Sequence, residues 1–275
     1  MDERDELIIE PGKSSVSTGL GGLWRYRELL YFLVWRDVKV KYKQTALGVA
    51  WAVLQPALAM IIFSVLFGRL ANLPSDGLPY PVFVLAGLLP WNYFASVLGL
   101  STLSLVANAN LISKIYFPRV IIPVSSASAA LIDLVIASLV LVVMMIWYGT
   151  PISAGVVLIP VLVLLTMMTA VGFGAWLSAL NVRYRDIQYA VPFLIQVWMF
   201  ATPVIYPRSL LGEEWGWLVY LNPMSGVIEA FRPALFGNRE IPWGGLAISI
   251  SVGLFVFITG MAYFRKVERH FADII

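Results

Sequence analysis

The feature that most constrains this chain is a set of long segments without a charged residue. These uncharged runs cover residues 44–68, 77–113, 187–207 and 241–264. In addition, Asp133 is the sole charge between Val120 and Val182. Each segment reaches or exceeds the roughly 20 apolar residues that a helix needs to cross a bilayer. Because 60% of the 275 residues are hydrophobic and 13% are charged, an ordinary water-soluble domain is excluded.

The stretch from Val120 to Val182 is more than twice as long as one span, so it must fold back on itself. Trp147 and Tyr148, followed by Gly149 and Pro151, predict a helix break at a membrane interface. We therefore expect an all-α membrane protein. Its six transmembrane helices are predicted over residues 46–68, 81–104, 120–147, 154–180, 188–206 and 244–264. No internal repeat is evident, which argues against secondary carriers built from inverted repeats.

Basic residues fall mainly on one side of these predicted spans. With a cytoplasmic N-terminus, the inner side holds Arg27, Arg36, Lys39, Lys41, Lys43, Lys114, Arg119, Arg183, Arg185, Arg265, Lys266 and Arg269. The outer side holds Arg69, Arg208, Arg232 and Arg239. Because Lys and Arg favour the cytoplasmic side, both termini are predicted to lie there. The formal net charge of +3 is thus a topology signal and no sign of nucleic-acid binding.

The N-terminal region divides into a tail and an amphipathic segment. Residues 1–22 are acidic and then Gly/Ser-rich, which predicts a disordered cytoplasmic tail without a cleavable signal peptide. Within residues 23–43, apolar side chains recur at helical spacing, namely Tyr26, Leu29, Leu30, Leu33, Val34 and Val38. This pattern predicts a helix lying in the membrane plane, either as a simple anchor or as a gating or docking element. Residues 44–275 form the six-span domain.

Two cytoplasmic loops are candidate contact sites for a partner. The loop at residues 108–119 keeps apolar residues at helical spacing outside the membrane core, namely Leu111, Ile112, Ile115, Tyr116 and Phe117. Such residues favour a groove in a partner, or else a short helix packed against the protein's own spans. The loop at residues 181–186, with Arg185 beside Asp186, is a solvated turn or a weaker partner contact.

The outer segment from Pro207 to Trp243 is long and apolar for a surface loop. A helix is predicted from Met224 to Phe236, and it places Glu229 and Arg232 three residues apart, where they can pair. Because no piece is long enough to span the bilayer, we expect short re-entrant helices over about residues 207–240. The helix from Met224 follows directly after Asn222 and Pro223.

Two further features lie within the predicted spans. Asp133 is costly at membrane depth, by roughly 2.5–3.5 kcal/mol, so it should face protein or water. It is either part of a polar pathway or a hydrogen-bonded packing residue. An aromatic and amide stripe occupies one face of the fifth span, namely Tyr189, Phe193, Gln196 and Phe200, with Trp51 and Gln55 as a shorter pair on the first span. Such stripes either pack against helices or offer sliding contacts to sugar rings.

The sequence offers little for catalysis. The chain has no cysteine and one histidine, and no paired carboxylates or metal-ligand cluster fit a single pocket. Gly12-Lys13-Ser14 resembles the end of a phosphate-binding loop, but Leu7 stands where that motif needs its first glycine. We therefore expect no enzyme and no metal in this chain.

Several motifs in order along the chain resemble one family. They are Tyr42-Lys43-Gln44-Thr45-Ala46-Leu47-Gly48 with Trp51 and Pro56, Leu89-Pro90-Trp91, Asn110-Leu111 with Lys114 to Arg119, Asn181 with Arg183 to Asp186, Pro203-Val204-Ile205-Tyr206-Pro207, and Asn222-Pro223. Together they resemble the membrane permease subunit of polysaccharide-exporting ABC transporters, the ABC-2 type family that exports O-antigen, capsule and teichoic acid. The resemblance extends from about residue 24 to the C-terminus.

The resemblance implies a homodimer in the bacterial inner membrane that encloses a channel for a lipid-linked glycan. It also implies two copies of a cytoplasmic ATPase subunit, which would hold the ATP and magnesium, so that no cofactor is expected in this chain. The implied coupling residues are Asn108, Asn110, Leu111, Lys114, Ile115, Tyr116 and Phe117, with Arg185 nearby. The candidate residues for this channel are those of the two stripes, Trp51, Gln55, Tyr189, Phe193, Gln196 and Phe200. The implied gate and re-entrant residues are Tyr42, Asn222, Pro223, Glu229 and Arg232.

Two other functions are compatible with the composition of this chain. An ABC-2 exporter of a small hydrophobic molecule would share the architecture and differ in having a closed, drug-sized pocket. A secondary carrier would need intramembrane charges for ion coupling, for which Asp133 is the clear candidate.

Overall fold

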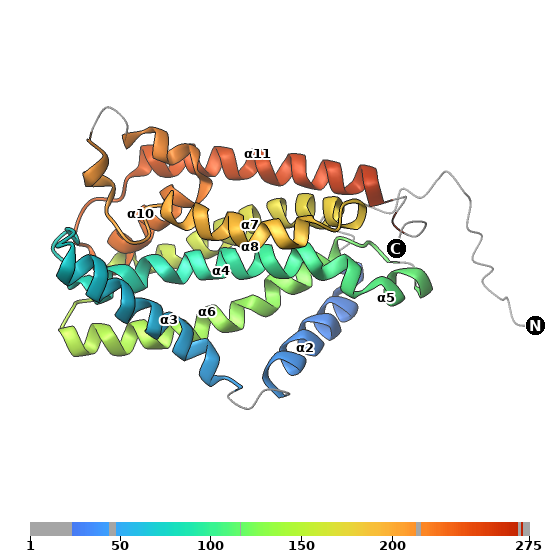
Figure 1. Cartoon of the computed structure of the whole chain (residues 1–275), viewed down its shortest axis with the longest axis horizontal. Helices are drawn as coiled ribbons and strands as arrows, with labels where there is room; N and C mark the ends of the chain where they lie inside the picture. Colours follow the sequence, from blue (N-terminus) through green and yellow to red (C-terminus); the bar gives the residue numbers. More distant parts are fainter. Residues whose placement is uncertain (1–23, 44–47, 116, 213–215, 269–270, 272–275) are drawn as a thin grey trace, which may run out of the picture.

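The computed structural model describes residues 24–43, 48–115, 117–212, 216–268 and 271, and within them every regular element is a helix. The α-helices are α2 (Arg27–Lys43), α3 (Ala50–Phe63), α4 (Tyr80–Ala107), α5 (Ala109–Lys114), α6 (Ile121–Tyr148), α7 (Ile159–Arg183), α8 (Ile187–Phe200), α10 (Pro223–Phe236) and α11 (Trp243–Glu268). The shorter elements are η1 (Ser64–Leu70), η2 (Ala154–Leu158), η3 (Arg208–Leu211) and η4 (Leu218–Leu221). Most long helices run along one axis, with α5 at one end of the bundle and α10 at the other (Figure 1).

Five helices of the described chain are long and apolar enough to cross a membrane. They cover Ala50–Leu70, Tyr80–Ala107, Ile121–Tyr148, Ala154–Arg183 and Trp243–Glu268. The predicted break after Tyr148 is confirmed, because α6 ends there and Gly149 follows with a left-handed φ of 65°. The fifth predicted span, residues 188–206, is helical only as far as Phe200. The 14-residue helix α8 is about 21 Å long at 1.5 Å per residue, which is shorter than a bilayer core of about 30 Å.

Helix α4 forms the centre of the bundle and packs against α3, α6, α7, α8 and α10. Of its most apolar 18-residue window, 78% is buried, against 11–33% for the other candidate spans. The outer helices therefore keep broad apolar faces exposed, as expected of helices that contact lipid or a second chain.

Small residues bring the central helices close together. A Cβ on Gly172 of α7 would lie 2.6 Å from the Phe257 backbone of α11, and one on Gly260 would lie 2.2 Å from the Gly172 carbonyl oxygen. On the other side of α7, a Cβ on Gly174 would lie 2.7 Å from Ser101 of α4. Small side chains at such crossings are the usual means of packing helices in a membrane, where water does not drive them together.

The predicted stripe of α2 is confirmed. Leu33 is buried in a cluster with Leu105, Ile121 and Phe264, and the other stripe residues pack on that cluster or are partly buried. The opposite face exposes Tyr31, Phe32 and Trp35. Helix α2 therefore uses one apolar face to contact the bundle and presents a second, aromatic face to its surroundings.

Candidate functional site

Asp133, in the apolar helix α6, is bound by two side chains from the last turn of α2. Lys41 Nζ lies 2.6 Å from Asp133 Oδ2, and the Tyr42 hydroxyl donates to Asp133 Oδ1. Burial, followed by the hydrogen bond to Asp133, raises the pKa of Tyr42, so its hydroxyl keeps its proton. We call Lys41, Tyr42 and Asp133 the α2–α6 cluster. The predicted charge in the span is thus a hydrogen-bonded and ion-paired carboxylate.

The α2–α6 cluster lies between two cavities. One, of about 770 Å³, is also lined by the predicted channel residues Trp51 and Gln55 together with polar side chains of α4. The other, of about 570 Å³, lies between α2, α4 and α6 and is lined by Arg36 and Asn108 at its far end. All three cluster residues line both cavities, so they form the wall that the two share.

A second polar link joins α2 to the corner between α4 and α5. Arg36 Nη1 donates to Asn108 Oδ1 at 2.8 Å, and its Nε and Nη2 donate to Asp37 Oδ1. The other end of the Asn108 amide donates to the Ser104 carbonyl oxygen at 2.7 Å. The predicted coupling residue Asn108 therefore ties α2 to α5.

The predicted coupling loop is divided between buried and exposed side chains. Phe117 and Ile112 are buried in the same cluster as Leu33, whereas 54% of Ile115 is exposed. Asn110 and Lys114 are also exposed, Leu111 is partly buried, and Tyr116 lies outside the described residues. Short helix α5 thus packs on the bundle through one face and leaves the other face exposed.

The predicted loop after α7 is organised by a buried amide. Asn181 donates to the Thr102 carbonyl oxygen of α4 at 3.1 Å and accepts from the Gln188 backbone N–H of α8 at 3.1 Å. Arg185, the residue predicted to face a partner, is exposed. Arg185 therefore lies at the α5 end of the bundle, on a loop held by three helices.

The predicted channel residues do not lie together in one chain. The α8 stripe is exposed, with 76% of Tyr189, 66% of Phe193 and 49% of Phe200 accessible, and Gln196 also exposed. None of these four residues is among those that line the cavity beside Trp51 and Gln55. The stripe is therefore not packing within this chain.

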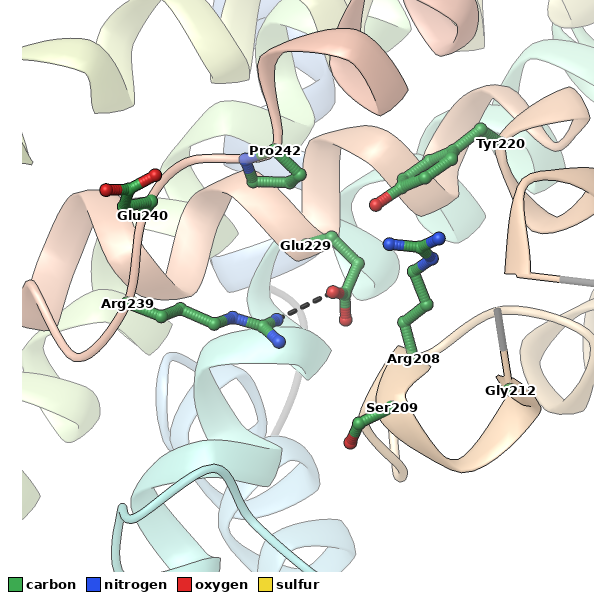
Figure 2. Close-up of a pocket in the computed structure, with 8 residues that line it drawn as sticks. All are labelled: Arg208, Ser209, Gly212, Tyr220, Glu229, Arg239, Glu240 and Pro242. Atoms are coloured by element: carbon green, nitrogen blue, oxygen red, sulfur yellow. Dashed lines mark hydrogen bonds and ion pairs between the residues drawn. The ribbon is translucent and has the colours of Figure 1, made fainter. Parts of the chain in front are cut away.

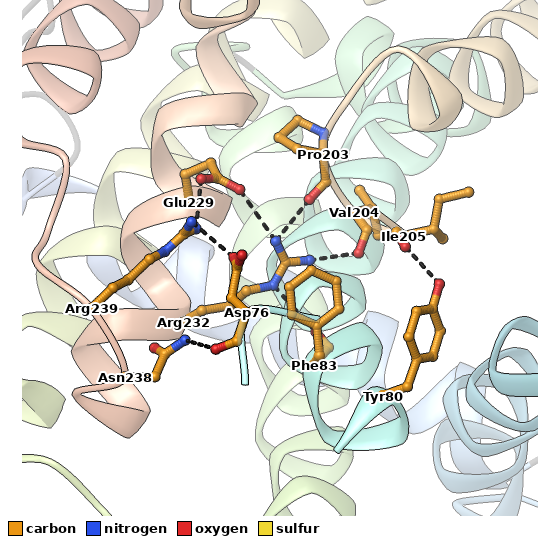
Figure 3. Close-up of polar contacts among 10 residues, drawn as sticks. All are labelled: Asp76, Tyr80, Phe83, Pro203, Val204, Ile205, Glu229, Arg232, Asn238 and Arg239. Atoms are coloured by element: carbon orange, nitrogen blue, oxygen red, sulfur yellow. Dashed lines mark hydrogen bonds and ion pairs between the residues drawn. The ribbon is translucent and has the colours of Figure 1, made fainter. Parts of the chain in front are cut away.

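At the opposite end, four charged residues, of which Glu229 and Arg232 are buried and Asp76 and Arg239 partly buried, form a group that we call the α10 charge cluster (Figure 3). Glu229 Oε2 accepts from Arg239 at 2.6 Å, and Arg239 also pairs with Asp76 at 2.8 Å. The predicted pair of Glu229 with Arg232 is confirmed, at the longer distance of 3.4 Å. The side chains of Arg232 and Glu229 are 0% and 2% exposed, so the charges are shielded from water.

Arg232 holds the end of α4 to the irregular segment after α8. Its guanidinium donates to the carbonyl oxygens of Pro203 at 3.0 Å, Val204 at 2.6 Å and Phe83 at 3.2 Å. It also lies over the Phe83 ring, 3.7 Å from the centroid. Burial lowers the pKa of Arg232 to about 10, so the group stays protonated at neutral pH. A neighbouring bond from the Tyr80 hydroxyl satisfies the Ile205 carbonyl oxygen at 2.6 Å (Figure 3).

Asn222 and Pro223 start helix α10. Asn222 Oδ1 accepts from the Met224 backbone N–H at 3.1 Å, and its amide donates to Thr202 Oγ1 at 2.8 Å. Pro223 occupies the first helical position, where its missing N–H costs nothing. All 14 residues of α10 are buried, so this helix belongs to the bundle core despite lying in the predicted outer segment.

Sequence reasoning missed several partners of these clusters. Lys41 was used only as a topology signal, and Asp76, Arg208, Tyr220 and Arg239 were not connected to Glu229. Within the described residues, no group of three or more His, Cys, Asp or Glu side chains could hold a metal ion.

The chain matches one family of membrane proteins and is similar to several transport proteins over most of its length. Residues 28–236 match the family described as ABC-2 type transporter. An O-antigen export system permease protein RfbA of Klebsiella pneumoniae is 30% identical over 249 residues, covering 90% of this chain and 95% of that protein. The RfbA protein of Myxococcus xanthus is 30% identical over 257 residues, with 92% and 97% covered. A polysialic acid transport protein KpsM of Escherichia coli is 26% identical over 242 residues, with 85% and 91% covered.

Proposed function

The chain belongs to the ABC-2 type transporter family, and from this premise we propose that it is the permease subunit of an ATP-driven polysaccharide exporter. The observation that carries the proposal is similarity over nearly the whole length of relatives named for O-antigen export and polysialic acid transport. The substrate would be a lipid-linked glycan that moves from the cytoplasm to the outer face of a bacterial inner membrane.

The proposed topology has six spans, with both termini in the cytoplasm. The α5 end of the bundle carries basic residues such as Lys114, Arg183 and Arg265, which favours the cytoplasmic side. The short helix α8 would be completed by residues 201–206, whose irregular backbone needs partners at membrane depth. Bonds from Arg232 and Tyr80 supply these partners, and the fully buried α10 suits a re-entrant helix.

The proposed complex is a homodimer with two copies of a cytoplasmic ATPase subunit. The exposed face of α5, with Asn110, Lys114 and Ile115, would fit a groove in that ATPase, and Arg185 lies at the same end. ATP and magnesium would bind the partner, because this sequence has no complete nucleotide-binding motif.

The exposed stripe on α8 would line the channel in the dimer. Tyr189, Phe193 and Phe200 present ring faces, and Gln196 presents an amide, so the surface could contact both faces and hydroxyls of a sugar chain. Rings without a deep pocket suit a polymer that slides. Trp51 and Gln55 would contact the substrate at the 770 Å³ cavity.

Helix α2 would act as the gate. Its aromatic face, with Tyr31, Phe32 and Trp35, suits the interface of the membrane, while Arg36 connects it to the coupling helix α5 through Asn108. ATPase closure would move α5 and α2 together. Separation of Lys41 and Tyr42 from Asp133 would then remove the wall between the two cavities and join them.

The proposal is tested by isolating the chain from its native membrane with the ATPase that accompanies it. The complex is reconstituted in vesicles with lipid-linked glycan extracted from the same cells. We expect glycan to cross the membrane only with ATP. Transport without ATP by a preparation that contains no ATPase would overturn the proposal in favour of a secondary carrier. ATP-driven export of a hydrophobic dye with no glycan movement would favour the small-molecule exporter.

The proposal that the α8 stripe lines the channel can be tested by comparing variants of α8. Replacing Phe193 and Phe200 with Ala should lower glycan export at least about tenfold while ATP hydrolysis continues. The matched control is Leu194→Ala, because Leu194 is also on α8 and 54% exposed, but outside the stripe. Equal export by the two variants would make the stripe a lipid or dimer contact without a role in the channel.

A further inference from the structure

A polar pocket lies beside the α10 charge cluster and is separate from the two cavities at the α2–α6 cluster. It is enclosed by η3, η4, α10 and the segment before α11, and Arg208, Ser209, Tyr220, Glu229, Arg239 and Glu240 line it (Figure 2). Its volume is about 410 Å³, within the roughly 300–1,000 Å³ of small-molecule sites. We call it the η3–α10 pocket.

A buried hydroxyl in this pocket lies beside the Arg208 guanidinium, which can donate to it, but has no acceptor for its own proton among the described residues. The residue is Tyr220, which is 4% exposed. More than nine in ten buried polar groups do have a partner, so a hydroxyl that donates to nothing in the protein is suited to an acceptor on a ligand. Figure 2 shows the hydroxyl directed into the pocket, toward Arg208 and Glu229. Burial raises the pKa of Tyr220, which keeps the hydroxyl available as a donor.

The side chains around this hydroxyl are held in place. A Cβ on Gly245 of α11 would lie 2.1 Å from the Tyr220 ring, so the ring rests directly on that helix. Arg208 donates through Nε to the Gly216 carbonyl oxygen at 3.0 Å, and its guanidinium lies 5.0 Å from the Tyr220 ring centroid. Glu229 is fixed by Arg239 at 2.6 Å. The pocket is therefore formed before any ligand arrives, which lowers the cost of binding.

The balance of charge selects the class of ligand. Two arginines, Arg208 and Arg239, and two glutamates, Glu229 and Glu240, line the pocket, so positive and negative groups are equal in number. A strong anion or cation would meet as much repulsion as attraction. A neutral molecule with several hydroxyls would instead use the guanidinium groups and Ser209 as donors and the carboxylates as acceptors, because each hydroxyl can both donate and accept.

We propose that the η3–α10 pocket binds one neutral sugar ring through its hydroxyls. The inference rests on the proposed function, since it assigns the pocket to a sugar of the exported glycan as the chain leaves the channel at the outer end. The pocket would hold the leading part of the glycan and so oppose its backward movement between ATP cycles.

The direct test measures binding with the purified protein in lipid nanodiscs. The probes are methyl glycosides of glucose, galactose, mannose, rhamnose and N-acetylglucosamine, and contact is detected by saturation-transfer NMR. We expect a signal from at least one of them, with a loss of at least about fivefold in Tyr220→Phe. This variant keeps the ring and removes the hydroxyl alone. The matched control, Tyr148→Phe, alters a partly exposed tyrosine at the same end of the bundle and should bind as the wild type does.

No signal from any of the five probes, or equal signals in Tyr220→Phe and wild type, would overturn the inference and leave the pocket as a water site. The proposed function fails separately, when the wild-type complex moves no glycan with ATP. A complex that exports glycan while its permease binds no sugar in this pocket would retain the proposed function and lose this inference alone.

Discussion

Asp133 of α6 and Glu229 of α10 both pair with a basic side chain at 2.6 Å, yet their surroundings differ. Lys41 and Asp133 are 51% and 21% exposed at the side chain, and they connect α6 to the end of a peripheral helix. Glu229 and Arg232 are 2% and 0% exposed, and Arg232 also contacts α4 and the segment after α8. Accessible ion pairs contribute roughly 0–1 kcal/mol, whereas breaking a buried pair costs about 3–5 kcal/mol.

The difference between these sites indicates two uses of charge in an apolar protein. The α2–α6 cluster contributes little to stability, and it forms the wall between two cavities, as the proposed gate requires. The α10 charge cluster provides a donor to the carbonyl oxygens of Pro203 and Val204, which lie outside the helices, so it maintains the structure. The first is suited to movement and the second to rigidity.

The largest expected effect comes from Arg232→Leu. The substitution removes the Arg232 donor to three backbone carbonyl oxygens and one of the two arginine partners of Glu229, so the free energy of unfolding should fall by about 3–5 kcal/mol. Thermal unfolding in detergent, followed by circular dichroism, measures it. Arg69→Leu serves as the control, because Arg69 is exposed and should tolerate the change. Equal melting curves for the two variants would remove the structural role of the α10 charge cluster.

A smaller loss is expected for Glu229→Gln. The amide keeps the shape but loses the charge that faces Arg232 and Arg239, while the carbonyl contacts of Arg232 remain. The free energy of unfolding should fall by about 1–3 kcal/mol in the same assay. A loss as large as that of Arg232→Leu would mean that the carboxylate, and not the bonds to backbone oxygens, carries the stability of this region.

The least effect on stability is expected for Asp133→Asn, where unfolding should shift by less than about 1 kcal/mol. The change should instead loosen α2. The native chain contains no cysteine, so a cysteine introduced at Ala129, which lines the 570 Å³ cavity, can be labelled selectively with a water-soluble maleimide. Labelling at this site should be severalfold faster with Asn at 133. If labelling were unchanged and the free energy of unfolding fell strongly, the α2–α6 cluster would serve stability and not movement.

Much of the fold could be predicted because the length of each apolar segment can be read from consecutive residues of the sequence. The break after Tyr148 and the pairing of Glu229 with Arg232 depend on neighbouring residues, and both are confirmed. Helix α8 ends at Phe200, ahead of the end of its apolar run, because Pro203 lacks an N–H and disfavours helical geometry in the residue before it.

The partners of the charged residues could not be predicted in the same way. Lys41 and Asp133 are 92 positions apart, and Asn238 reaches the Asp76 backbone across 162. No periodicity or motif links such residues, because their proximity depends on how whole helices pack. Arg232 shows a further limit, since most of its acceptors are backbone carbonyl oxygens, which leave no mark in the sequence.

The most direct test of the account is a cross-link between α2 and α6. Cysteines at Val38 of α2 and Ala129 of α6 would both line the 570 Å³ cavity and leave the α2–α6 cluster intact. The linker is a bismaleimide with a reducible disulfide, and a maleimide with a single reactive group controls for modification alone. We expect the linked complex to lose ATP-driven glycan export and to regain it when the linker is reduced. Export by the linked complex at the rate of the singly modified control would contradict the claim that α2 must leave α6.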